Sequence, residues 1–234
     1  MAAQHPVLFF PGTLCDERIF LPLWKSLSIA QRRYVPLQWA ATKDDMLALS
    51  KDRVLPNEKV HLVGYSMGGY IAALFASMVP QQIASITLIG YSPLGLSADE
   101  IAKRKQLVTM LRKGQFKTDN PAYLSRFVHP SRMNDESVIG VVKAMANDLG
   151  KNTLLNHTQA TTPREDTTAM LAKINAPVTF IAAQQDNIAP LNDIQRTAKQ
   201  IPHATLHELE NTGHMIPLEQ TAQLATIIDK QVSD

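Results

Sequence analysis

Short apolar runs alternate with longer amphipathic stretches over residues 7–89 and again after about residue 166. Apolar runs bounded by glycine, proline or polar residues are typical of strands buried on both faces of a parallel sheet. The pattern predicts strands at residues 7–10, 34–39, 60–63, 86–89, 178–183 and 204–209. The proline in the second of these favours a place at an edge of the sheet.

Helices are predicted where apolar residues recur every three or four positions. Five such stretches lie between or after the strands, at residues 16–27, 42–54, 70–79, 192–201 and 220–232. Asp16 and Thr42 are predicted N-caps, Asp45 completes a capping box with Thr42, and Asp166 caps a further helix through Ile174. Alternating strands and helices predict an α/β fold with three α/β/α layers and a mostly parallel six-stranded sheet.

The alternation is interrupted between residues 92 and 168, where no β-rich run occurs. Helical patterns follow one another there, at residues 99–113, 121–128 and 137–149. Structureless loops of this length are rare, so the excursion predicts an inserted helical layer. Residues 1–95 and 167–234 are therefore expected to form the core, and residues 96–166 the insertion.

Composition narrows the possible functions. The 234 residues are 45% apolar and 19% charged, as in an ordinary soluble globular domain. A net charge of +2 gives no reason to expect nucleic acid or an acidic membrane as partner. The lone Cys15 excludes a disulfide framework within the chain and a cysteine-built metal site. The N-terminus shows no secretory signal, so a cytoplasmic location is expected. We further expect a monomer or homodimer that acts on a small-molecule substrate without a metal or cofactor.

The stretch Gly64-Tyr65-Ser66-Met67-Gly68 stands between a predicted strand and a predicted helix. In that setting the pattern G-x-S-x-G indicates a nucleophile elbow, a sharp turn that lifts a serine hydroxyl clear of the sheet. The glycines are needed because side chains at their positions would keep strand and helix apart. Ser66 is the predicted nucleophile, and the Met67 N–H at the start of the helix faces any oxyanion that forms beside it.

A base and an acid are expected in the loops that follow later strands, because reactive groups in a parallel sheet lie beyond the carboxyl ends of its strands. Asp186 is the carboxylate after strand 178–183, and His214 follows strand 204–209. A single aspartate or histidine in a loop is more often structural or solvated. The occurrence of both after the expected strands, in the order serine, acid, histidine, favours a catalytic triad with Ser66.

These features resemble the α/β-hydrolase family over nearly the whole chain. The matching segments are Pro11-Gly12-Thr13, Gly64-Tyr65-Ser66-Met67-Gly68-Gly69, Pro177-Val178 running to Asp186, and Gly213-His214. In the family a His-Gly pair usually follows the first of these strands, and the next residue supplies an oxyanion-hole N–H. Pro11 replaces that histidine here, so the resemblance implies Thr13 as the donor beside Met67, with Leu14 as the fallback.

The resemblance also implies that residues 96–166 form a helical lid over the elbow. The pocket beneath it is expected to be apolar around Leu14, Tyr65 and Met215. Most basic residues on a helical layer face water, but an arginine that points inward must be paired. Arg126 is the predicted substrate-binding arginine, with Arg132 and Arg164 as further candidates, and the expected partner is a carboxylate or phosphate of the substrate.

The leading functional hypothesis is a serine hydrolase, a carboxylic-ester hydrolase in the first instance, that cleaves a small ester, thioester or related acyl substrate through an acyl-enzyme. Two alternatives use the same residues. One is a hydrolase or lyase of carbon–carbon bonds, in which Ser66 orients the substrate and His214 shuttles protons. The other is a ligand receptor with negligible turnover. The fold alone does not separate these three, because function resides in the site.

Overall fold

A computed structural model of the chain describes residues 5–115 and 121–233. Within that part six strands form one parallel sheet in the order β2-β1-β3-β4-β5-β6. Their bounds are Val7–Phe10 for β1, Arg32–Tyr34 for β2, Val60–Tyr65 for β3, Ile83–Ile89 for β4, Val178–Ala183 for β5 and Ala204–Leu209 for β6. The predicted three-layer α/β/α fold is confirmed, and every strand pair is parallel.

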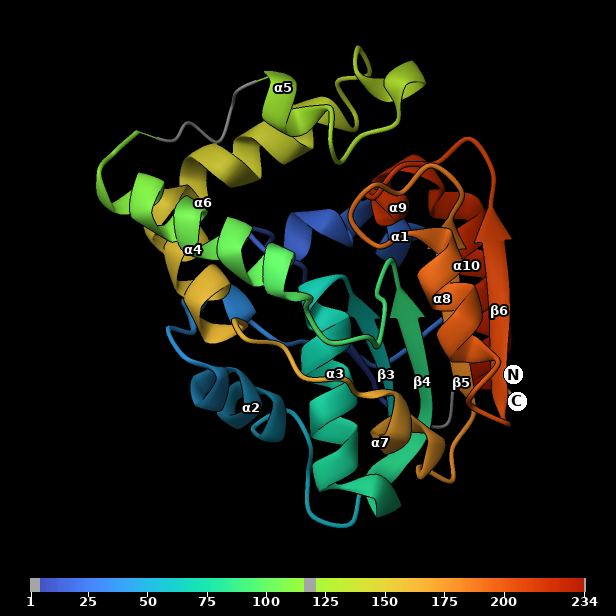
Figure 1. Cartoon of the computed structure of the whole chain (residues 1–234). Helices are drawn as coiled ribbons and strands as arrows, with labels where there is room; N and C mark the ends of the chain where they lie inside the picture. Colours follow the sequence, from blue (N-terminus) through green and yellow to red (C-terminus); the bar gives the residue numbers. More distant parts are fainter. Residues whose placement is uncertain (1–4, 116–120, 234) are drawn as a thin grey trace.

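Helices cover both faces of the sheet (Figure 1). One face carries α2 (Lys43–Lys51), α3 (Met67–Met78), α7 (Thr168–Ala172) and α8 (Leu191–Ala198), and the other carries α1 (Leu21–Ser26), α9 (Ile216–Glu219) and α10 (Thr221–Ser233). Successive side chains of a strand point to opposite faces. Accordingly Leu8 and Phe10 pack with the first group, and Val7 and Phe9 with the second.

The chain between β4 and β5 forms α4 (Ala98–Arg112), α5 (Pro121–Leu124) and α6 (Ile139–Ala160). These helices lie at the end of the molecule toward which the strand arrows point (Figure 1). The helix expected over 137–149 does lose its regular geometry at Gly150, which has φ 68°, and a second helical stretch that was not expected continues α6 to Ala160. Glycine takes this left-handed conformation without steric cost, so it marks a kink here instead of a helix end.

Other sequence expectations are also wrong in their bounds. The helix expected over 121–128 ends at Leu124. The predicted strand 34–39 lies earlier, because Val35 N–H makes the last bond to Phe9 and Pro36 has no N–H to continue the ladder. Residues Leu37–Trp39 form a 3₁₀ turn instead. Likewise Asp16 caps a 3₁₀ turn over Glu17–Ile19, and α1 begins only at Leu21, with a proline in its first turn.

The predicted caps are otherwise confirmed. Thr42 and Asp45 form a reciprocal capping box at the start of α2. The side chain of Asp166 accepts a 2.7 Å hydrogen bond from the Thr168 N–H at the start of α7. Among the described residues no helix is both long and apolar enough to cross a membrane. Residues 1–4, on which the expectation about a secretory signal rested, lie outside the described part of the chain.

Candidate active site

Ser66 stands at the sharp turn between β3 and α3, with φ 52° and ψ −117°. A non-glycine residue in this conformation is strained, and the surrounding turn must hold it there. The turn leaves no room for side chains: a Cβ on Gly68 would lie 2.2 Å from the Phe10 carbonyl oxygen, and one on Gly64 2.7 Å from that of Gly68. The glycines of the motif are therefore required by the close approach of β1, β3 and α3.

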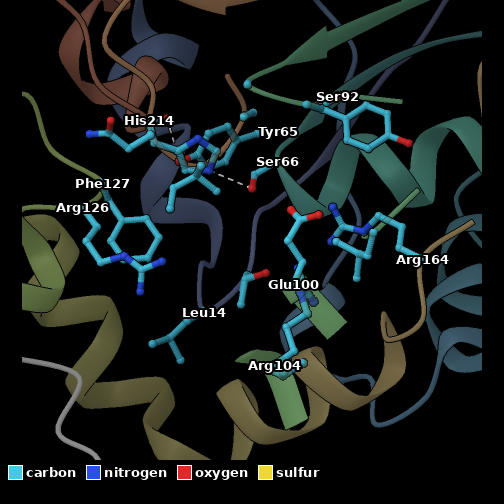
Figure 2. Close-up of a pocket in the computed structure, with 18 of the residues that line it drawn as sticks. Leu14, Tyr65, Ser66, Ser92, Glu100, Arg104, Arg126, Phe127, Arg164 and His214 are labelled. Atoms are coloured by element: carbon cyan, nitrogen blue, oxygen red, sulfur yellow. Dashed lines mark hydrogen bonds between the residues drawn. The ribbon is translucent and has the colours of Figure 1, made fainter. Parts of the chain in front are cut away.

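Ser66, His214 and Asp186 form one chain of hydrogen bonds. His214 Nε2 lies 2.9 Å from Ser66 Oγ, and His214 Nδ1 lies 2.7 Å from Asp186 Oδ2. The side chains of His214 and Asp186 are almost fully buried, and the bond between serine and histidine is visible in Figure 2. The three residues that the sequence predicted as nucleophile, base and acid thus lie within hydrogen-bond distance in the predicted order.

The second carboxylate oxygen of Asp186 fixes the orientation of the first. Oδ1 accepts hydrogen bonds from the N–H groups of Ile188 at 2.7 Å and Ala189 at 2.9 Å. An ionised carboxylate only accepts, so the proton between Asp186 and His214 belongs to Nδ1. This arrangement leaves Nε2 as the acceptor for the Ser66 hydroxyl, which is the protonation state that a general base needs.

Glu219 organises the loop that carries His214, and sequence reasoning missed it. Its buried carboxylate accepts hydrogen bonds from the N–H groups of Gly213 at 2.9 Å, Met215 at 3.1 Å and His129 at 3.2 Å. Burial raises the pKa of Glu219, while the three N–H groups favour the charged form. The Tyr65 hydroxyl adds a 3.0 Å bond to the His214 carbonyl oxygen.

The inserted segment also contacts the histidine loop. The Phe127 carbonyl oxygen accepts hydrogen bonds from the N–H groups of His214 at 2.7 Å and Met215 at 3.2 Å. His129, another histidine of the inserted segment, places its Nδ1 2.7 Å from Ser131 Oγ and does not line the cavity. Arg132 lies outside the cavity as well and pairs with Asp135 at 3.0 Å.

Two backbone N–H groups beside Ser66 are available to an oxyanion. Met67 is the first residue of α3, and Thr13 follows β1; neither N–H is hydrogen-bonded to another residue in the described part of the chain. The Leu14 N–H, in contrast, donates to His157 Nδ1 at 3.1 Å. Leu14 is therefore not available as the fallback donor, and the geometry favours Thr13 with Met67.

His157 is a completely buried residue of α6 that the sequence did not reveal. Its Nε2 lies 2.9 Å from the Leu37 carbonyl oxygen, so the imidazole donates there and accepts from Leu14 at Nδ1. Burial lowers the pKa of His157 to about 4, which keeps the ring neutral near pH 7. Leu14 itself has φ 54°, and the bond from its N–H holds it in that conformation.

A cavity of about 690 Å³ opens above Ser66 and His214 (Figure 2). The expected substrate-binding residues Leu14, Tyr65, Met215 and Arg126 all line it, as does Thr13. Apolar side chains of the inserted segment add to the lining: Leu107, Phe127, Val142, Met145 and Leu154. Cys15 also faces this cavity, and burial raises the pKa of its thiol to about 12, so it is a neutral filler. The described residues contain no cluster of three or more side chains suited to hold a metal ion.

Known proteins resemble this chain in sequence over about two thirds of its length or more. Monoacylglycerol lipase ABHD6 of Mus musculus is 25% identical over 187 residues, which cover 74% of this chain and 55% of that protein. The 2-hydroxy-6-oxononadienedioate/2-hydroxy-6-oxononatrienedioate hydrolase 2 of Pseudomonas putida is 28% identical over 175 residues, 67% of this chain and 57% of that one. The chain thus spans little more than half the length of these two relatives.

Likeness of fold extends further than likeness of sequence. A thermophilic esterase from Thermogutta terrifontis superposes with a TM-score of 0.86 over 100% of this chain and 91% of that chain, at 20% identity. The sequence model of the family described as alpha/beta hydrolase fold matches residues 40–221, well over half of the chain. With the elbow, the parallel sheet and this match together, the chain belongs to the alpha/beta hydrolase fold family.

Proposed function

We propose that the protein is a serine hydrolase that cleaves a small ester, thioester or related acyl substrate through an acyl-enzyme. The observation that carries the proposal is the chain of hydrogen bonds from Ser66 through His214 to Asp186, at 2.9 and 2.7 Å, beside a cavity large enough for a small molecule. The names of the relatives, a lipase and a hydrolase among them, support hydrolytic chemistry.

In the proposed reaction Ser66 Oγ attacks the acyl carbon, and its proton passes to His214 Nε2. Asp186 holds the imidazole in the required tautomer and stabilises its charged form. The N–H groups of Thr13 and Met67 donate to the oxyanion of the tetrahedral intermediate. Collapse of that intermediate expels the alcohol or thiol, which takes the proton from His214. A water molecule then attacks the acyl-enzyme with the same base and releases the acid.

The inserted helices serve as a lid in this proposal. They supply a large part of the apolar lining of the cavity, and Leu14, Tyr65 and Met215 supply its floor next to the reacting atoms. Because this lining excludes water from the acyl group, the electrostatic contribution of the two N–H donors is larger than it would be in solvent. The carbonyl of Phe127 ties the lid to the histidine loop, so closure of the lid and placement of the base are coupled.

The proposal is tested by labelling with an active-site fluorophosphonate and by turnover of an activated ester. The intact protein should be labelled once, on the peptide that contains Ser66, and Ser66→Ala should lose labelling and turnover together. Ser77→Ala is a matched control, since Ser77 is exposed on the same helix and its hydroxyl bonds only the Leu74 carbonyl. Turnover retained by Ser66→Ala would remove the acyl-enzyme mechanism.

A second candidate is hydrolysis or lysis of a carbon–carbon bond on the same residues, favoured by the 28% identity to the Pseudomonas putida hydrolase. In that reaction His214 moves the proton and Ser66 orients the substrate without being acylated. An active wild-type protein that resists the fluorophosphonate, with Ser66→Ala inactive, would support this candidate. Saturable ligand binding with negligible turnover on every substrate would instead support a receptor.

A further inference from the structure

Two arginines of the cavity lie away from the reacting atoms, on the same side of Ser66. Arg104 comes from α4, and Arg164 comes from the segment between α6 and α7. Figure 2 shows both on one side of the pocket together with Glu100, while Arg126 lies on the opposite side beside Phe127. The cavity therefore has a cationic end that is distinct from the apolar region around Leu14.

Two other cationic residues of the lining have carboxylate partners, whereas Arg126 at the opposite end has none among the described residues. Arg196 pairs with Asp193 at 3.1 Å, and Lys103 pairs with Asp99 at 2.6 Å. Neither Arg104 nor Arg164 forms an ion pair with any residue that the structure describes. Arginines in a partly closed cavity without a carboxylate partner carry a desolvation cost that a bound anion would offset.

Both guanidinium groups are held in place by neutral contacts. Arg104 Nη1 donates to the hydroxyls of Thr161 and Thr162, each at 3.3 Å. The guanidinium of Arg164 lies over the ring of Tyr70, 5.0 Å from its centroid. Its Nε is buried and has no hydrogen-bond partner among the described residues. A buried donor left unsatisfied is costly, so Arg164 retains hydrogen-bonding capacity for a ligand.

The charge balance at this end favours a single negative charge on the ligand. The Glu100 carboxylate bonds the N–H and the hydroxyl of Ser97, each at 2.8 Å, as part of the cap of α4. Two arginines and one glutamate leave a net charge of +1. Burial first, and then repulsion from Arg164, lower the pKa of Arg104 to about 10, which leaves Arg104 charged near pH 7. Burial also lowers the pKa of Arg164, but a guanidinium keeps its proton in proteins.

We propose that the substrate carries a carboxylate remote from the bond that Ser66 attacks, and that Arg104 and Arg164 bind it. The inference rests on the proposed function and names its substrate class: acyl compounds with a distal carboxylate, such as half-esters of dicarboxylic acids. The planar forks of two arginines suit a carboxylate, and the net charge of +1 matches a monoanion better than a phosphate dianion. The sequence pointed to Arg126 first, with Arg132 and Arg164 as further candidates; the proposal keeps Arg164, adds Arg104 and leaves Arg126 at the opposite end of the cavity.

The test compares mono-p-nitrophenyl esters of succinate, glutarate and adipate with p-nitrophenyl esters of matched chain length that end in a methyl group. The wild-type protein should show a higher kcat/KM for the carboxylated ester of the fitting length, by roughly tenfold to a hundredfold, as expected for charge-assisted hydrogen bonds. Arg104→Gln and Arg164→Gln should each remove most of that preference and leave hydrolysis of the neutral ester nearly unchanged. Lys105→Gln is the matched control, because it removes an exposed positive charge next to Arg104 on the same helix.

Glu100→Gln should change the preference for the carboxylated ester in the opposite direction, by increasing it. Glutamine at this position still serves the capping box with Ser97, so α4 keeps its start. The net charge of the cationic end rises from +1 to +2, and the preference for the carboxylated ester should increase. A purely structural role of the two arginines predicts no such increase, since it does not depend on charge.

Three outcomes would overturn the inference. Equal kcat/KM for carboxylated and neutral esters on the wild-type protein would show that no carboxylate is recognised, while the proposed hydrolase function would stand. Loss of the preference in Arg126→Gln alone would place the carboxylate at the other end. If no ester is hydrolysed, the proposed function fails. The inference is then tested by calorimetry, which compares the binding of monomethyl glutarate to Ser66→Ala and to the double variant Ser66→Ala with Arg164→Gln. Equal affinity of the two proteins would exclude a role of Arg164 in binding the carboxylate.

Discussion

The carboxylate of Asp186 has one orientation open to it in the fold. Its Oδ1 accepts from the N–H groups of the partly buried Ile188 and the buried Ala189, and these donors have no other partner in the described structure. Turning the carboxylate would leave them unsatisfied, at a cost of roughly 1–3 kcal/mol each. The loop after β5 thus determines which oxygen faces His214, and through it the tautomer of the base.

Asp186→Asn should lower turnover by roughly a factor of 10³ or more. The two N–H groups require an acceptor, so the amide oxygen of asparagine will occupy the position of Oδ1. The amide NH₂ then faces His214 Nδ1 and donates to it, which puts the imidazole proton on Nε2. In that tautomer Nε2 cannot accept the Ser66 proton. The measurement is kcat on an activated ester, together with the melting temperature.

The melting temperature should stay close to that of the wild-type protein, because every hydrogen bond of the site keeps a partner. Asp186→Ala is the control that removes the acceptor as well, and it should be both inactive and less stable. Nearly normal activity of Asp186→Asn would mean that another acid serves His214, and the proposed triad would have to be revised.

The sequence predicted Ser66, Asp186 and His214 because each of them follows a recognisable strand. It missed residues whose role depends on contacts across the fold. The bond from Leu14 to His157 joins residues 143 positions apart, and the Tyr65 hydroxyl reaches the His214 carbonyl across 149 positions. No local pattern encodes such contacts, so they emerge only when the elements are packed together.

At the scale of elements, α6 supports the loop after β1. Its second half, beyond the kink at Gly150, places the His157 ring between the Leu14 N–H and the Leu37 carbonyl oxygen. The sequence placed the end of this helix at residue 149, because glycine usually weakens a helix. Gly150 does leave helical geometry, but a second helical stretch follows it directly. The half of the helix that was not predicted therefore carries the residue that fixes the oxyanion loop.

His157→Leu should lower kcat on a neutral ester by roughly tenfold to a hundredfold, since removal of a properly placed oxyanion donor costs at least that much in other hydrolases. The leucine leaves the Leu14 N–H without an acceptor, and the neighbouring Thr13 N–H then loses its fixed direction. KM should change less, because the cavity lining is retained. The measurement is the separate determination of kcat and KM.

His157→Gln is the rescue for this variant, because glutamine can both accept from Leu14 and donate to Leu37. It should recover much of the lost kcat. If leucine and glutamine lowered kcat equally, or if both affected only the melting temperature, His157 would have a structural role alone. In that case the position of Thr13 would not depend on α6.

At the scale of the whole molecule, alternation of strands and helices was enough to predict the parallel sheet and the edge where the site lies. It was not enough to predict how the inserted helices fold over that edge. Most basic residues of the insertion were expected to face water, and Arg104 of α4, which the sequence did not single out, lines the cavity. Which face of such a helix turns inward depends on packing with the core, for example of Leu111 and Leu154 against Leu14.

Two buried histidines, His61 and His157, make the stability of the fold depend on pH. His157 and His61 are both buried, and burial lowers the pKa of each from 6.5 to about 4. Between these pH values the unfolded chain binds protons that the folded chain does not bind. The free energy of unfolding therefore falls as the pH falls from 6.5 to about 4 and levels off below that range. Each histidine contributes roughly 3 kcal/mol to this loss.

His157→Gln should reduce that loss by about half, because glutamine takes up no proton and the effect of His61 remains. The free energy of unfolding is measured by urea denaturation at pH 7, 5.5 and 4.5 for the wild-type protein and the variant. Comparing the two cancels the contributions of all other groups, including Glu219, whose raised pKa acts in the opposite direction. The same substitution at the exposed His207 is the matched control. Identical pH dependence in the wild type and His157→Gln would show that His157 is not held neutral in the folded protein, and that its bonds to Leu14 and Leu37 do not form as described.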